Sequence, residues 1–138
     1  MTGIPARRAC DTVNDIPQPK LVLLVDDDDD IREVTQTSLE LVDGFRIITA
    51  SNGREAVRQA REHHPDGILL DMMMPGVDGL ATLEMLNADP ATAGIKVILL
   101  TARVDGVQQT PTVAGLIPKP FDPMSLGVEV SRMMGWSR

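Results

Sequence analysis

Residues 67–79 read Gly-Ile-Leu-Leu-Asp-Met-Met-Met-Pro-Gly-Val-Asp-Gly, an apolar run that ends in one carboxylate and then turns sharply. A run of this length, closed by Pro75 and Gly76, predicts a buried strand that delivers its last residue, Asp71, to a loop. Ligands bind outside the carboxyl ends of the strands in open parallel sheets, so an aspartate there is placed for chemistry. Asp71 could equally cap a turn, which is a common use of aspartate. This stretch alone leaves both interpretations open.

The length and composition of the chain narrow the class of protein. Its 138 residues favour one domain that is large enough to bury a core, and its net charge of −7 argues against nucleic acid or an anionic membrane as a direct partner. No apolar run approaches the roughly 20 residues that span a bilayer, and the start of the chain lacks the apolar centre of a signal peptide. The single cysteine, Cys10, cannot form an internal disulfide, so we expect a cytoplasmic protein. Because aromatic residues are scarce, we expect an aliphatic and methionine-rich core.

The first half of the chain opens with a tail and a strand. Residues 1–19 contain three prolines and little periodicity, which predicts a flexible tail before a single domain over residues 20–138. The apolar run Lys20–Val25 is typical of a central parallel strand and leads into five consecutive aspartates. The last three aspartates fit the first turn of a helix, whereas Asp26 and Asp27 lie at the strand end. Helical spacing then follows at Ile31, Val34, Ser38, Leu41 and Val42.

The rest of the chain alternates strands and helices. Strands are expected at 45–50, 66–71, 96–100 and 114–117, and helices follow Ser51-Asn52-Gly53, Asp78 and Asp122-Pro123. The segment 103–112 shows little apolar periodicity, so the fourth helix should be short or irregular. This alternation predicts an α/β fold, a doubly wound five-stranded parallel sheet of flavodoxin-like order 2-1-3-4-5 with helices on both faces.

The predicted strand ends bring together a set of polar side chains. The first strand supplies Asp26 and Asp27, the third Asp71, the fourth Thr101 and the fifth Lys119. The first and third strands are neighbours in this topology, so three carboxylates would share one pocket, where Mg2+ would relieve their repulsion. Lys119 adds a positive charge and Thr101 a hydroxyl. The set suits phosphoryl transfer to a carboxylate, with Asp71 as candidate nucleophile and the other two aspartates as metal ligands.

Four motifs resemble, in this order, the receiver domain of two-component response regulators: Val25-Asp26-Asp27, the run from Leu70 to Gly79, Leu100-Thr101-Ala102 and Pro118-Lys119-Pro120-Phe121. The resemblance covers about residues 20–135. It implies that a histidine kinase or histidine phosphotransfer protein phosphorylates Asp71. It also implies that Asp27, Asp71 and the backbone carbonyl of Met73 bind Mg2+ directly, while Asp26 acts mainly through water. Thr101 and Lys119 would hold the phosphoryl oxygens, and Met73 and Arg103 would tune hydrolysis of the acyl phosphate.

By this likeness the chain is not a conventional enzyme, although it would catalyse its own phosphorylation and dephosphorylation. We expect a single-domain receiver, monomeric or weakly dimeric, whose phosphorylation changes its binding to a downstream protein. A phosphorylation-independent interaction module is the alternative, and five acidic residues in the first loop disfavour a flavin carrier.

Two departures from the family pattern affect the expected output. Leu116 stands where the family usually has an aromatic residue that moves on activation, which puts that movement in doubt. The segment from Thr101 to Lys119 is also about one helical turn shorter than usual. The family commonly binds its targets through the face built from the fourth helix, the fifth strand and the fifth helix. We therefore expect this face to be reshaped through residues 103–112.

Overall fold

The computed structural model describes residues 19–73, 79–101 and 113–136. Its five strands form one sheet of order β2-β1-β3-β4-β5 in which all neighbours are parallel. The strands are β1 (Leu21–Val25), β2 (Arg46–Ala50), β3 (Gly67–Asp71), β4 (Lys96–Thr101) and β5 (Val113–Pro118), and the helices are α2 (Asp29–Asp43), α3 (Gly53–His63), α4 (Gly79–Ala88) and α5 (Pro123–Met134). The predicted fold and strand order are confirmed. The segment expected to hold a short or irregular fourth helix lies outside the described residues.

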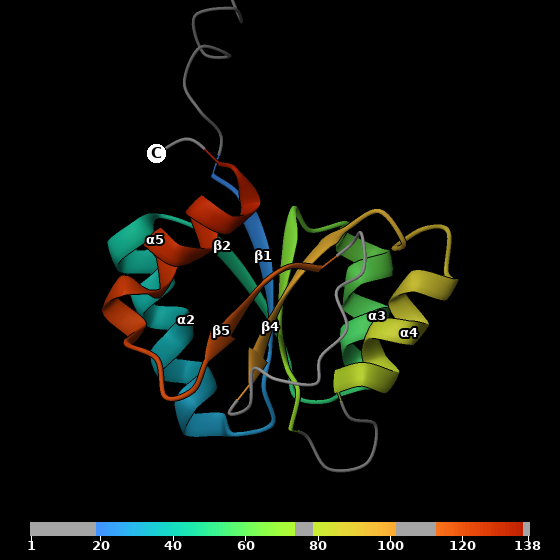
Figure 1. The fold of residues 1–138 in the computed structure, drawn as a ribbon, viewed down its shortest axis with the longest axis horizontal. Helices are drawn as coiled ribbons and strands as arrows, with labels where there is room; N and C mark the ends of the chain where they lie inside the picture. The colour runs from blue at the N-terminus through green and yellow to red at the C-terminus, as the bar shows by residue number, and fades with distance from the viewer. Residues whose placement is uncertain (1–18, 74–78, 102–112, 137–138) are drawn as a thin grey trace, which may run out of the picture.

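The sheet is the middle of three layers. Helices α2 and α5 cover one of its faces, and α3 and α4 cover the other (Figure 1). Successive strand residues point to opposite faces, so Leu23 and Val25 pack toward α3 and α4, while Val22 and Leu24 pack toward α2 and α5. Because both faces are covered, an uninterrupted apolar strand is stable here, as in β3, where every residue is buried.

The buried core is aliphatic, as expected, but it is not rich in methionine. Leu, Ile and Val fill the strands, and Met134 is the buried methionine among the described core residues. The side chains of Met73 and Met124 are 69% and 60% exposed, respectively. The expectation was wrong because leucine and β-branched side chains fill the pleated strands, which leaves most of the described methionines outside the fully buried core.

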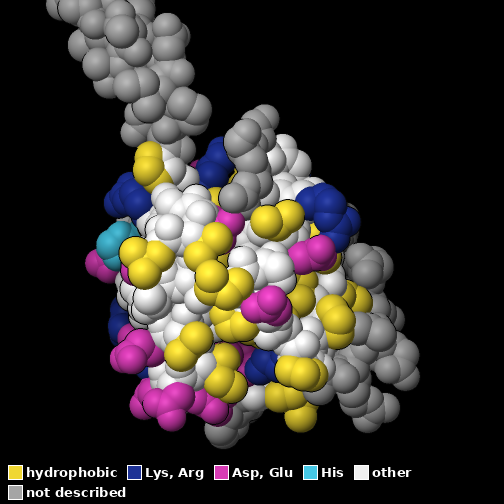
Figure 2. All heavy atoms as spheres, turned by 90° about the vertical axis from the view of Figure 1, so that its left-hand side faces the viewer, with side chains coloured by type: hydrophobic (Ala, Val, Ile, Leu, Met, Phe, Trp, Pro, Cys, Tyr) yellow, Lys and Arg dark blue, Asp and Glu magenta, His cyan; other side chains and the backbone are white. Residues whose placement is uncertain are grey.

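The buried face of α2 differs from the face that the apolar spacing indicated. Thr35 and Leu39 are buried, whereas the four apolar residues of the predicted stripe are between 41% and 81% exposed: Ile31, Val34, Leu41 and Val42. Figure 2 shows hydrophobic side chains on the face formed by α2 and α5. A spacing of three and four residues is met both by this exposed stripe and by the buried pair Thr35 and Leu39. The periodicity therefore identified the helix but not the face that packs on the sheet.

The helices begin and end at residues suited to those positions. Asp28 caps α2 by accepting hydrogen bonds from the backbone N–H groups of Asp30 and Ile31, at 3.0 and 3.1 Å, and Gly44 ends that helix with φ +72°. Asp122 caps α5, with proline at the first helical position. Helix α3 ends at His64, a non-glycine residue with φ +48°. None of the helices in the described ranges combines the length and apolarity needed to cross a membrane.

An aromatic contact joins the residue before β2 to the end of α5. The rings of Phe45 and Trp136 meet edge to face with centroids 5.7 Å apart, and the Lys20 ammonium lies 5.4 Å from the Trp136 ring. Gly67 begins β3 beneath this ring, and a Cβ atom there would lie 3.2 Å from the indole and 2.6 Å from Met134. Trp136 therefore packs on the edge of the sheet opposite the carboxyl ends of the strands.

Candidate functional site

Two aspartates are placed side by side by the register of the sheet. Val25 on β1 pairs with Leu70 on β3, so the next residues along the two strands are Asp26 and Asp71. The backbone N–H of Asp26 donates to the Ala50 carbonyl at 3.1 Å, which extends the β1–β2 ladder by one residue. Both acids are thus held by the rigid part of the fold, at the carboxyl edge where the sequence placed them.

Asp27 completes a cluster of three carboxylates. Oxygen atoms of Asp26, Asp27 and Asp71 all lie within 4.8 Å of one another. Asp26 and Asp71 are each only 1% exposed, whereas Asp27 is exposed. The structure therefore brings together all three predicted acids and leaves the cluster open to solvent on the side of Asp27.

Lys119 supplies a positive charge to this cluster. Its backbone N–H donates to the Thr101 carbonyl at 2.8 Å, which fixes the residue just beyond the end of β5. Its ammonium nitrogen lies 3.2 Å from Oδ1 of Asp71 and 3.8 Å from Oδ2 of Asp26. The lysine thus contacts the predicted nucleophile most closely.

The cluster raises the pKa of the Asp26 carboxyl above its usual value. Burial of the carboxyl group is the main cause, and the nearby charges of Asp71 and Asp27 act in the same direction. A hydrogen bond from the Asp28 N–H at 2.9 Å and the charge of Lys119 oppose this rise. The ionised form of the Asp26 carboxyl is therefore disfavoured in this buried position.

The donor set fits a hard divalent cation. Three carboxylates and one ammonium group leave two negative charges, which is the charge that one divalent ion would balance. Carboxylate oxygens are preferred ligands of Mg2+, which commonly takes one or two of them together with water and phosphate oxygens. Asp26, Asp27 and Asp71 could therefore hold a metal ion of this kind.

Thr101 and Met73, the two other predicted site residues, are placed at the end of β4 and just after the end of β3, but their proposed roles are not tested by this geometry. Thr101 is the last residue of β4 and is 4% exposed. The Met73 backbone N–H donates to Oδ1 of Asp71 at 3.0 Å, so the chain after β3 folds back over that carboxylate. The proposed roles of the Thr101 hydroxyl and the Met73 carbonyl stay predictions.

The structure adds one residue that the sequence reasoning missed. Nη1 of Arg32 donates to the backbone carbonyl of Asp26 at 2.7 Å, and Nη2 pairs with Oδ1 of Asp29 at 2.5 Å. The sequence did contain a signal for this contact. Arg32 lies in the first turn of the helix predicted after five consecutive aspartates, so its cationic side chain has many acceptors within reach.

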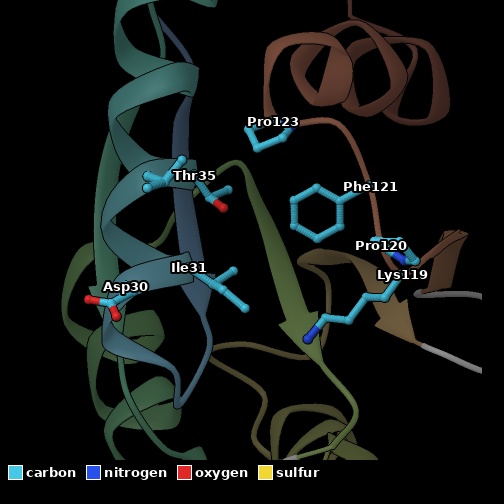
Figure 3. A pocket seen from close by; sticks show the side chains of 8 residues that line it. Asp30, Ile31, Thr35, Lys119, Pro120, Phe121 and Pro123 are labelled. Carbon is cyan, nitrogen blue, oxygen red and sulfur yellow. The ribbon is translucent and has the colours of Figure 1, made fainter.

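A hollow of about 580 Å³ lies beside the acidic cluster, between α2 and the segment that follows β5. Ile31, Val34, Phe121 and Pro123 form most of its apolar wall, and Lys119 borders it. Figure 3 shows Phe121 between α2 and the lysine, whose amino group extends toward the end of β3. The site thus combines a charged centre with an apolar rim.

These features define a class of protein: an α/β domain whose acidic cluster and lysine lie at the carboxyl edge of a doubly wound sheet. The chain matches the family described as "Response regulator receiver domain" over residues 22–131. It therefore belongs to the response regulator receiver family, as the sequence motifs indicated.

Individual relatives agree with this assignment. The chain is 36% identical over 121 residues to the response regulator Rre1 of Synechocystis, a match that covers 85% of this chain and 52% of the relative. It resembles the chemotaxis protein CheY4 of Vibrio cholerae, with a TM-score of 0.72, 26% identity, and coverage of 84% of this chain and 99% of that one. The chain spans about half the length of the curated relatives that it matches.

A second similar structure bears directly on the acidic cluster. It is the receiver domain of the sensor histidine kinase PA1611 from Pseudomonas aeruginosa, with a TM-score of 0.73, 26% identity, and coverage of 86% of this chain and 99% of that one. It was crystallised with a magnesium ion coordinated in the active-site cleft.

Proposed function

We propose that this chain is a phosphorylation-controlled receiver that accepts a phosphoryl group on Asp71 from a phosphohistidine of a histidine kinase or phosphotransfer protein. The observation that carries the proposal is the contact of the buried Asp71 with Lys119 at 3.2 Å, inside a cluster of three carboxylates. Asp26, Asp27 and Asp71, with the Met73 carbonyl, would hold Mg2+, which neutralises charge on the transferred group when it is bound. The magnesium in the PA1611 receiver supports this choice of metal.

The proposed chemistry is an in-line displacement. A carboxylate oxygen of Asp71 attacks the phosphorus atom of the phosphohistidine, the phosphorus–nitrogen bond breaks, and the electron pair of that bond stays on the imidazole nitrogen. Lys119 pairs with the negative oxygens of the phosphoryl group, and the Thr101 hydroxyl donates a hydrogen bond to one of them. Water later hydrolyses the acyl phosphate, which releases inorganic phosphate and restores the Asp71 carboxylate.

The rim of the site suits a protein as the phosphoryl donor. Ile31 and Val34 are 41% and 53% exposed, and both line the hollow that Lys119 borders. Apolar side chains exposed next to a charged centre are typical of surfaces that another protein covers. A donor that brings a phosphohistidine to Asp71 would bury these side chains.

The test is to incubate the chain with Mg2+ and acetyl phosphate and to measure the intact mass. We expect a fraction of the protein to gain one phosphoryl group in the wild type and none in Asp71→Asn. Glu62→Gln, which removes an exposed carboxylate from α3, is the matched control and should behave as the wild type. Absence of the mass gain in the wild type would contradict the proposal and would favour a phosphorylation-independent interaction module. An equal gain in Asp71→Asn would also contradict it, because the phosphoryl group would then be on another residue.

A further inference from the structure

Arg32 connects the end of β1 to the first turn of α2. Its guanidinium donates through Nη1 to the Asp26 carbonyl, six residues earlier, at 2.7 Å and contacts the Asp29 carboxylate through Nη2 at 2.5 Å. The Arg32 side chain is 20% exposed, although that of Asp29 is 84% exposed. The guanidinium is therefore held against the protein by its bond to the strand end rather than by a solvated surface ion pair.

The acceptor of that bond belongs to the peptide that joins the first two residues of the acidic cluster. The other groups of Asp26 are fixed already, because its N–H donates to the Ala50 carbonyl and its carboxylate accepts from the Asp28 N–H. The carbonyl sets the plane of the Asp26–Asp27 peptide, and that plane fixes the positions of N and Cα of Asp27, from which its side chain extends. A bond that holds this plane therefore restricts where the one solvent-exposed carboxylate of the cluster can lie.

We propose that Arg32 is a positioning residue for the divalent-ion site. Its guanidinium holds the Asp26–Asp27 peptide so that the Asp27 carboxylate meets that of Asp71, and the site is arranged before the ion arrives. The inference rests on the metal-binding part of the proposed function. Residues that orient metal ligands in this way commonly change metal affinity by about 10- to 100-fold when they are replaced.

The sign of the effect separates positioning from simple electrostatics. A positive charge near a cation site repels the cation, so removal of the Arg32 charge alone should strengthen Mg2+ binding. Loss of positioning should weaken it. Lysine keeps the charge but has no planar fork with which to donate to a carbonyl and a carboxylate at once, so Arg32→Lys should not restore the affinity.

The ion pair between Arg32 and Asp29 can be removed without removing the hydrogen bond from Arg32 to the Asp26 carbonyl. It joins residues three apart on α2, with the Asp29 carboxylate in solvent, and such pairs contribute little to stability. Asp29→Asn removes this pair and leaves the Arg32 bond to the Asp26 carbonyl. We therefore expect Asp29→Asn to change Mg2+ affinity by less than about twofold, within the weak effect of an exposed charge.

The experiment is calorimetric titration of the full chain with MgCl2 at neutral pH. Arg32→Ala and Arg32→Lys should each weaken Mg2+ binding by about tenfold. Arg58→Ala is the charge-matched control, because Arg58 is 71% exposed on α3 and pairs with Glu55 only at 3.7 Å. It should bind Mg2+ as the wild type does. Urea unfolding without Mg2+ establishes whether each variant is folded, and Arg32→Lys carries the test if Arg32→Ala does not fold.

The outcomes distinguish this inference from the proposed function. Unchanged or tighter Mg2+ binding in Arg32→Ala, or full affinity in Arg32→Lys, would overturn the role of Arg32 and leave the phosphoryl acceptor untouched. A wild-type chain that binds Mg2+ but is not phosphorylated on Asp71 would overturn the proposed function and leave the role of Arg32 standing. A wild-type chain that binds no Mg2+ would overturn both.

Discussion

Substitution of Asp26 by asparagine should stabilise the metal-free protein. Asp26 is buried with Asp71 and near Asp27, and its pKa is raised chiefly by burial, so its ionised form is disfavoured in the folded state. Asparagine has the same shape and keeps an oxygen that can accept the hydrogen bond from the Asp28 N–H. The change therefore removes a charge from the cluster and leaves its local backbone contact intact.

The magnitude follows from the distances in the site. At an effective dielectric constant of about 20, repulsion from Asp71 within 4.8 Å costs about 3 kcal/mol and attraction to Lys119 at 3.8 Å contributes about 4 kcal/mol. The exposed Asp27 adds a screened repulsion of up to about 1 kcal/mol. These terms nearly cancel, so the cost of burying a charge decides the sign, and we expect Asp26→Asn to be about 1–2 kcal/mol more stable.

Mg2+ should reduce this advantage. An ion at ten times its dissociation constant raises the stability of the wild type by about 1.4 kcal/mol, and a variant that lacks one carboxylate gains less. The assay is urea unfolding followed by circular dichroism at neutral pH, in EDTA and in Mg2+. Asp66→Asn is the matched control, since Asp66 is exposed and also accepts a backbone N–H, from Leu21 at 2.8 Å.

Two results would refute the reasoning. The first is a metal-free Asp26→Asn variant that is less stable than the wild type, because the buried charge would then be net stabilising. The second is an equal gain from Mg2+ in the wild type and the variant, because Asp26 would then take no part in binding the ion.

Three further predictions concern stability. Thr35→Val should stabilise the protein by about 1 kcal/mol, because the buried hydroxyl has no hydrogen-bond partner among the described residues. Thr92→Val should destabilise it by about 1 kcal/mol, because it loses a 2.7 Å hydrogen bond to a backbone carbonyl. Changes of the same sign in the free energy of unfolding, measured in urea, would contradict this. His64→Gly should stabilise by about 1 kcal/mol, since φ is +48° there, and a lower melting temperature would count against it. Bonds from the N–H and hydroxyl of Ser51 lower the pKa of Glu55 below 4.5, so its contribution should be complete above pH 4.5 and fade as the pH falls through the lowered pKa. Unfolding of Glu55→Gln and wild type at several pH values should show this, and a difference that grows in acid would oppose it.

The fold was predictable because local and global signals agree in this chain. Apolar runs such as Lys20–Val25 are stable only as strands covered on both faces, and Gly44 and Asp122 mark helix ends by backbone geometry and capping that depend on neighbouring residues alone. The inner face of α2 was not predictable in the same way. It depends on how the helix rests on the sheet and on α5, where Thr35 is buried in place of the more apolar Val34.

The acidic cluster was predictable for a topological reason. Parallel strands end at one edge, so residues that follow β1 and β3 must meet once the strand order is known, as Asp26 and Asp71 do. Arg32 was not predicted, because its contact depends on a side chain reaching back six residues to a carbonyl, which no spacing rule encodes. The arrangement of donors around a backbone atom has to be seen in three dimensions.

The position of Trp136 has a practical consequence for spectroscopy. It is the chain's single tryptophan, the sequence has no tyrosine, and its ring packs over Gly67, at the opposite end of β3 from Asp71. At about 3.3 Å per residue the indole lies about 13 Å from the carboxylates along that strand. Its fluorescence should report the unfolding of the sheet without being quenched directly by a bound ion. Unfolding can then be followed by tryptophan fluorescence, and occupancy of the ion site by calorimetry, on the same sample.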